Sequence, residues 1–162
     1  MPTKSKAKPV AEQTPAVSLC SSADSLFRAA AECCRQHARY SRLVEHDVCD
    51  AEEDAACELV TLSDTLLHRM VNDYVAGAAS ANGHGDDAWW HKANMLLQAS
   101  REYVRHARRC DDEGRRMGTH TAARLGELAL EYELAASAIM ALRHAVDDYR
   151  RVRPEADLTA HK

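Results

Sequence analysis

The sequence predicts an all-α protein, an antiparallel up-down-up-down four-helix bundle with a flexible N-terminal tail. The first observation is composition. The 162 residues include only 5% aromatic side chains, six glycines and four prolines, which favours helices over sheets. The second is the apolar pattern of the last third of the chain, where spacings of three and four residues alternate and keep one stripe on one side of a helix. The length suits one domain with a sizeable core.

The last predicted helix, from Thr121 to Arg153, carries the most regular apolar stripe. Pro154 ends this helix, because proline disfavours helical geometry in the residue before it. One helix cannot bury its own stripe, so it needs partner helices. The residues of the stripe are Leu125, Leu128, Tyr132, Ala135, Ile139, Leu142, Val146 and Tyr149.

The chain before residue 21 is expected to be a flexible tail, because its prolines, lysines and few large apolar side chains cannot offset the entropy of ordering. The first helix begins near Ser21 or Ser22, either of which can cap it. We therefore expect a tail over 1–20, the bundle over 21–153 and a C-terminal tail over 154–162. The expected inward positions of the first helix are Ala23, Phe27, Ala30, Cys34, His37, Ser41, Val44 and Val48.

The second helix is expected to open at Asp50, which has the form of a capping box with Glu53, and to end near Ser80. A polar, glycine-rich loop over 82–85 separates it from the third helix. Short connections make successive helices antiparallel neighbours. The expected inward positions are Ala56, Leu59, Ser63, Leu66 and Met70 in the second helix, flanked by Val60, Leu67 and Tyr74, and Trp89, Ala93, Leu96, Ser100, Tyr103, Ala107, Cys110, Gly114 and Met117 in the third.

Charge and composition argue against several classes of partner. A formal net charge of -4 gives no overall attraction to nucleic acids or anionic membranes. No stretch reaches the roughly 18 consecutive apolar residues of a membrane-spanning helix. The basic N-terminus is not followed by the apolar segment of a secretory signal, so we expect a cytoplasmic location. The six cysteines are then expected to be reduced.

Counting residues from the expected turns places several polar side chains at one depth in the middle of the bundle. Buried polar groups are costly unless they are hydrogen-bonded. Such a layer either fixes the register of the helices, which we favour, or lines a pocket for a small ligand or a metal. The candidate ligand-binding residues are His37, Cys34, Ser63, Tyr103 and Tyr132, with Ser41 and Ser100 within a turn.

Two other sets of residues have the spacing of metal ligands on one helix face. Cys33 lies four residues before His37, and Glu102 lies four residues before His106, which Cys110 follows at the same spacing. The Glu-x-x-His motif of ferritin-like di-metal bundles is absent from the sequence. Acid–histidine pairs at this spacing also stabilise surface helices. The leading interpretation therefore has no cofactor, and a transition metal is the alternative.

Histidine phosphotransfer is a further alternative, because bacterial phosphotransfer domains place an exposed histidine on a four-helix bundle. Those domains carry lysine and glycine just after the histidine. Here His68, which also follows Asp64 at a spacing of four, precedes Arg69, and His106 precedes Ala107. The sequence contains no P-loop, dinucleotide-binding turn or His-Glu-x-x-His motif.

We therefore expect a non-enzymatic protein that acts through protein contacts, as a homodimer or an adaptor. Trp89 and Trp90, near the glycine-rich loop, form the candidate contact surface. The arginines of the third helix are expected to pair with the acidic start of the second helix, which argues against a nucleic-acid partner. The two sets are Arg101, Arg105, Arg108, Arg109, Arg115 and Arg116, and Glu52, Glu53, Asp54 and Glu58.

Overall fold

The computed structural model describes residues 15–46, 50–79, 87–115 and 122–153. These residues form four helices and no strand, which confirms the all-α prediction. None of the helices offers an apolar stretch that could span a bilayer. The helices are α1 (Pro15–Glu45), α2 (Asp50–Ala78), α3 (Ala88–Arg115) and α4 (Ala122–Val152).

The first helix begins at Pro15, earlier than the predicted start at Ser21 or Ser22. Proline suits the first turn of a helix, because its missing N–H needs no partner there. Leu19, four residues later, is buried, so this segment belongs to the packed structure rather than to the predicted tail. The expected loop over 82–85 lies outside the described residues, as does Pro154.

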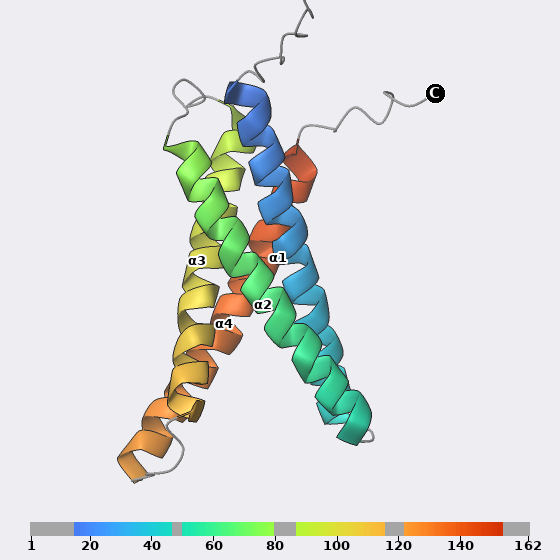
Figure 1. The fold of residues 1–162 in the computed structure, drawn as a ribbon, viewed down its shortest axis with the longest axis vertical. Helices are drawn as coiled ribbons and strands as arrows, with labels where there is room; N and C mark the ends of the chain where they lie inside the picture. Colours follow the sequence, from blue (N-terminus) through green and yellow to red (C-terminus); the bar gives the residue numbers. More distant parts are fainter. Residues whose placement is uncertain (1–14, 47–49, 80–86, 116–121, 154–162) are drawn as a thin grey trace, which may run out of the picture.

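The four helices form two hairpins that cross each other (Figure 1). α1 packs along α2 and α3 packs along α4, and the two pairs diverge like the legs of an inverted V. We call α1 with α2 arm 1, and α3 with α4 arm 2. The arms meet at the closed end, near the start of α1 and the end of α4, and stand apart at the open end, where α1 and α3 finish (Figure 1).

The core shared by both arms occupies the closed half. On α1 it reaches from Leu19 to Cys34, and on α4 it begins only at Ala138. Full burial of one leucine stabilises a protein by about 1.5–3 kcal/mol, so this half supplies most of the stability. Leu96 and Leu142 are wholly buried, as predicted. The largest fully buried side chains are Tyr74, Tyr103, Tyr149, Leu19, Leu26, Leu67, Leu96 and Leu142.

Polar and aromatic contacts tie α1 to α4 at the closed end. The Arg153 guanidinium lies 3.3 Å from the Asp24 carboxylate and 5.1 Å from the centroid of the Phe27 ring. The Phe27 and Tyr149 rings lie 5.5 Å apart, centroid to centroid. These contacts fasten the end of the chain's last helix to the start of its first.

Burial is lost step by step along α1. At every seventh residue, Ala23 and Ala30 are 0% exposed, His37 is half-buried and Val44 is 49% exposed. Residues seven apart lie on nearly the same side of a helix, so one side of α1 passes from core to solvent. The expected inward position of Val44 is therefore wrong.

The same change runs along α4. Val146 is buried, Ile139 is half-buried, Tyr132 is 56% exposed and Leu125 is 50% exposed. The predicted burial of Tyr132 and Leu125 is wrong, although Leu128 on the side of α3 is buried. The reason is the divergence of the arms, which takes arm 1 away from this side of α4 (Figure 1).

The buried face of α2 is turned relative to the prediction. Leu59 and Leu66, expected inward, are 37% and 44% exposed, whereas Leu67 and Tyr74, expected at the flank, are wholly buried. Ser63 is buried as expected. The face of α2 that enters the core is thus centred on the residues assigned to the flank.

A matched pair of neighbours on α3 tests the position of the core. Leu96→Ala should lower the free energy of unfolding by about 2–5 kcal/mol, because it leaves a cavity in a wholly buried site. Met95→Ala, at a 45% exposed position, should cost about 1 kcal/mol or less. Urea unfolding followed by circular dichroism measures both values, and equal losses would contradict the described core.

Candidate functional site

Four polar side chains meet where the two arms separate. Cys33 and His37 come from α1, Asp64 from α2 and Tyr103 from α3. Cys33 and His37 are four residues apart, which places them on one face of α1. Cys33 and Tyr103 belong to the shared core, and beyond them the arms diverge. We call these four residues the fork cluster.

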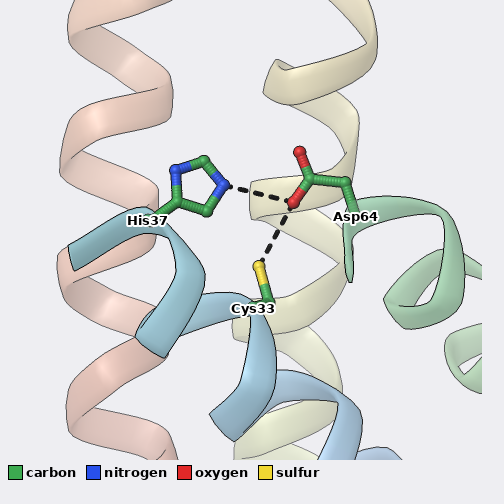
Figure 2. Close-up of side chains that lie close together, drawn as sticks. All are labelled: Cys33, His37 and Asp64. Atoms are coloured by element: carbon green, nitrogen blue, oxygen red, sulfur yellow. Dashed lines mark hydrogen bonds and ion pairs between the residues drawn. The ribbon is translucent and has the colours of Figure 1, made fainter. Parts of the chain in front are cut away.

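The Asp64 carboxylate is the centre of the fork cluster, and Figure 2 shows the Cys33 and His37 side chains directed at one of its oxygens. Its Oδ1 atom lies 3.3 Å from Cys33 Sγ, 3.2 Å from His37 Nε2 and 2.9 Å from Tyr103 Oη. Tyr103 Oη also contacts His37 Nε2, and the two rings meet edge to face, with centroids 5.3 Å apart. Side chains of three helices thus converge on one carboxylate oxygen.

The fork cluster is closed on one side and open to water on the other. Cys33 and Tyr103 are 0% and 1% exposed. The side chains of His37 and Asp64 are 26% and 24% exposed. A small solute or an ion can therefore reach the imidazole and the carboxylate without opening the core.

Burial keeps two of these groups protonated. It raises the pKa of the Cys33 thiol, and the charge of Asp64 raises that pKa further. Burial likewise raises the pKa of the Tyr103 hydroxyl, again with a contribution from the Asp64 charge. Both groups therefore donate hydrogen bonds to Asp64 Oδ1. The Tyr103 oxygen remains free to accept the Nε2–H of His37.

Three side chains of the fork cluster are of types that can ligate a metal ion. Among the residues that the structure describes, Cys33, His37 and Asp64 are the one group of three potential metal ligands whose atoms all lie within 4.8 Å of one another. The same contacts also serve as a hydrogen-bonded clasp between the arms, since Tyr103 belongs to arm 2 and the other three to arm 1.

The structure brings together only part of the predicted polar layer. His37 and Tyr103 meet in the fork cluster. Ser63 donates a hydrogen bond to the Val60 carbonyl oxygen, 2.8 Å away. Cys34 lies near Arg143 and Asp147 on the α4 side, where burial raises the pKa of its thiol to about 11.

Tyr132 lies on the exposed part of arm 2, outside the layer. The count of residues from the turns assumed that all four helices lie side by side along their whole length, so that residues at equal counts lie at equal depth. Helices of different arms lie side by side only as far as the fork.

The second predicted metal set is a buried histidine between two carboxylates. His106 is 5% exposed, so the Glu102–His106 spacing does not mark the surface helix pair considered as the alternative. Its Nε2 lies 3.1 Å from a Glu102 oxygen and its Nδ1 lies 2.9 Å from a Glu131 oxygen. Cys110 is buried. The third member of the group is Glu131 of α4, which the spacing of residues on α3 could not reveal. Arg109 pairs with Glu131 at 3.0 Å, so this group joins α3 to α4 as an ion-pair network.

The histidines considered for phosphotransfer are both engaged. His68 is half-buried, with its ring nitrogens 3.4 Å from the Asn72 amide and 3.3 Å from the Arg108 guanidinium. His106 is enclosed by its two carboxylates, which repel a phosphoryl group. Neither arrangement favours a phosphotransfer role.

The two tryptophans are less prominent than expected for a contact surface. Both are half-buried and pack against the shared core. Trp90 lies 6.4 Å from the Tyr74 ring and 6.0 Å from the Trp89 ring, centroid to centroid. Most of the large exposed apolar side chains lie instead in the open halves of the arms.

The acidic start of α2, residues 52–58, is separated from the arginines of α3. Among the described residues, no ion pair joins the two segments, because they lie on different arms that diverge (Figure 1). Arg109 pairs with Glu131, and Arg108 contacts His68. The expected neutralisation of the acidic segment within one chain is not observed.

Arginines of α1 and α4 line a groove that sequence reasoning missed. It consists of two adjoining hollows of about 370 Å³ each. Most of its charge is matched by neighbouring carboxylates, so we assign it no ligand. The pairs are Arg28–Asp24 at 2.7 Å, Arg35–Glu32 at 2.6 Å and Arg150–Asp147 at 2.8 Å.

Comparison with known proteins gave no match to a protein-family model, a curated protein or a solved structure.

The His106 network predicts a pH-dependent contribution of Glu131. The hydrogen bond from His106, and then Arg109, lower the pKa of Glu131 below its usual 4.5. A carboxylate with a lowered pKa stabilises the fold above its unfolded-state pKa, and this contribution is lost as the pH falls through the folded-state pKa. Glu131→Gln should therefore lower the urea midpoint at neutral pH.

The difference from the wild type should shrink below pH 4.5, for example at about pH 3. Glu127→Gln, at an exposed position one turn earlier, is the control and should change neither midpoint. A Glu131→Gln effect of equal size at both pH values would contradict the role of the ionised carboxylate.

Proposed function

We propose that this protein is non-enzymatic and acts through protein contacts, as a homodimer in which arm 1 of each copy packs against arm 2 of the other. The observation that carries the proposal is the apolar surface of the open halves. In this dimer each arm packs against a helical hairpin of the partner, and the two hairpins together form an antiparallel four-helix bundle. The predicted bundle is then completed between two copies.

The exposed apolar side chains of the open halves are too many for a typical solvated surface. Monomeric proteins rarely expose large contiguous apolar patches. About half of each side chain remains to be buried, which is worth about 1 kcal/mol apiece. Leu130 and Leu134 lie on the side of α4 opposite to Tyr132 and are not counted, so the other six side chains of both copies amount to about 12 kcal/mol, against an association cost of roughly 4–15 kcal/mol. The residues counted are Val44, Leu59, Leu62, Leu66, Leu125 and Tyr132.

Charge favours pairing of unlike arms. The helices of arm 1 contain ten acidic and five basic side chains, and those of arm 2 contain nine acidic and ten basic ones. Two copies of arm 1 therefore repel each other. A twofold axis that places arm 1 beside the partner's arm 2 makes the favourable contact twice. The acidic start of α2 then lies beside a less acidic surface.

Closure of the two arms within one chain is disfavoured by the helices themselves. Straight helices that cross in the shared core continue to separate, and sharp kinks occur mainly at proline, at glycine or at helix bulges. No proline lies within the helices beyond Pro15, and the helix glycines Gly77, Gly114 and Gly126 lie near helix ends. A second copy covers the apolar sides without bending any helix.

Sedimentation velocity tests the dimer. The wild type should sediment as a species of twice 17.9 kDa. Tyr132→Lys or Leu62→Lys, at positions 56% and 65% exposed, should raise the dissociation constant at least tenfold, about 1.4 kcal/mol, without loss of helical circular dichroism. Ser137→Lys, an exposed polar position on α4, is the matched control and should remain dimeric. A monomeric wild type at high concentration would overturn the proposal.

Charge reversal tests which arms pair. Replacing Glu52, Asp54 and Glu58 together by lysine should weaken the dimer by an order of magnitude or more, because the acidic side chains face the more basic arm of the partner. The same change should strengthen the dimer if two copies of arm 1 face each other. Comparison of dissociation constants at low and high salt checks that the effect is electrostatic.

A further inference from the structure

We propose that the fork cluster binds a divalent transition metal ion, with Zn²⁺ as the best fit, through Cys33 Sγ, His37 Nε2 and Asp64 Oδ1. The site adds a ligand-binding property to the proposed dimer and does not depend on it. Its three ligands come from two neighbouring helices of one arm. The fourth position of the metal faces the side that is open to water.

The spacing of the three atoms suits tetrahedral coordination. Zinc bonds of about 2.0–2.3 Å at tetrahedral angles require ligand atoms roughly 3.3–3.6 Å apart. Asp64 Oδ1 lies 3.3 Å from Cys33 Sγ and 3.2 Å from His37 Nε2. All three atoms lie within 4.8 Å of one another. Two of the three separations are thus close to those that zinc requires.

The scaffold holds the ligands before the ion arrives. Cys33 and His37 occupy successive turns of α1, the arrangement by which one helix face chelates a metal in His-x-x-x-His sites. Asp64 is kept in place by the hydrogen bond that Tyr103 donates at 2.9 Å. Ligands on helices, supported by an outer hydrogen bond, have the rigidity that metal sites require.

Charge balance favours a divalent ion in this half-buried place. On binding, the S–H bond of Cys33 breaks, the zinc–sulfur bond forms, and the proton leaves to water through the open side. His37 binds through Nε2 as the neutral imidazole with its proton on Nδ1, so its contact with Tyr103 Oη gives way to the ion, while Tyr103 keeps its hydrogen bond to Asp64. The thiolate and the Asp64 carboxylate together carry two negative charges, which neutralise the two positive charges of the ion. The buried sulfur thus gains a partner for its charge.

The donor types select the metal. One sulfur, one imidazole nitrogen and one carboxylate oxygen suit Zn²⁺ and its neighbours in the first transition row. Mg²⁺ and Ca²⁺ bind mainly oxygen ligands, so they should not compete. Tyr103, through its bond to Asp64, is a positioning residue rather than a ligand.

Cobalt substitution is the direct test, because a bound thiolate gives Co²⁺ a charge-transfer absorption that histidine-only surface sites lack. The 162-residue protein should bind one Co²⁺ with this band, and Zn²⁺ should displace it. Cys33→Ser and His37→Gln should abolish the band or weaken binding by more than roughly 100-fold. Cys34→Ser, the neighbouring buried cysteine on another face, is the matched control and should keep it.

Tyr103→Phe separates positioning from ligation. It should retain the thiolate band and weaken metal binding by roughly 10–100-fold. Absence of the band in the wild type, or its survival in Cys33→Ser, overturns the proposal. If Cys33→Ser loses helical circular dichroism, the partly exposed His37→Gln variant decides, and an unchanged affinity there overturns the proposal equally.

Discussion

The arms of this protein share a core over only about half of their length, and the other features depend on that constraint. Tyr74, Tyr103 and Tyr149 fill the closed half, where four helices supply neighbours to one another. Each helix continues beyond this core with only the other helix of its own arm beside it. One hairpin partner can cover one side of a helix, so apolar side chains on the remaining sides face solvent. The exposed leucines of α2 and α4 follow from this geometry.

The fork cluster marks the place where the shared core ends. A polar group deeper in the core would lack water and need full pairing, and one farther along the arms would be solvated and loosely held. At the fork, Cys33 and Tyr103 are enclosed while His37 and Asp64 touch water. That combination gives fixed geometry, raised pKa values for the thiol and the phenol, and access for an ion.

Sequence periodicity predicted what depends on a single helix. Leu96 and Leu142 are buried as the stripes indicated, because the repeat of a helix is local. Tyr132 and Leu125 belong to the same stripe as Leu142 yet are exposed. The crossing of the arms does not change the spacing of apolar residues along the sequence, so the sequence pattern could not reveal it. Counting residues from the turns correctly placed His37 and Tyr103 at the same depth, near the fork. It missed Asp64 as their partner because the face of α2 was assigned with the wrong rotation.

Tyr103 connects the two proposals physically. The three proposed ligands lie on arm 1, whereas the phenol that positions Asp64 lies on arm 2, at the point where the arms part. If metal affinity depends on that hydrogen bond, it depends on the position of arm 2 relative to arm 1. The proposed dimer, which packs through the open halves, would hold the arms in one relative position. Binding free energies are reciprocal, so a dimer that holds Tyr103 against Asp64 strengthens metal binding by the factor by which the metal strengthens the dimer. A dimer that moves α3 away from α2 weakens both.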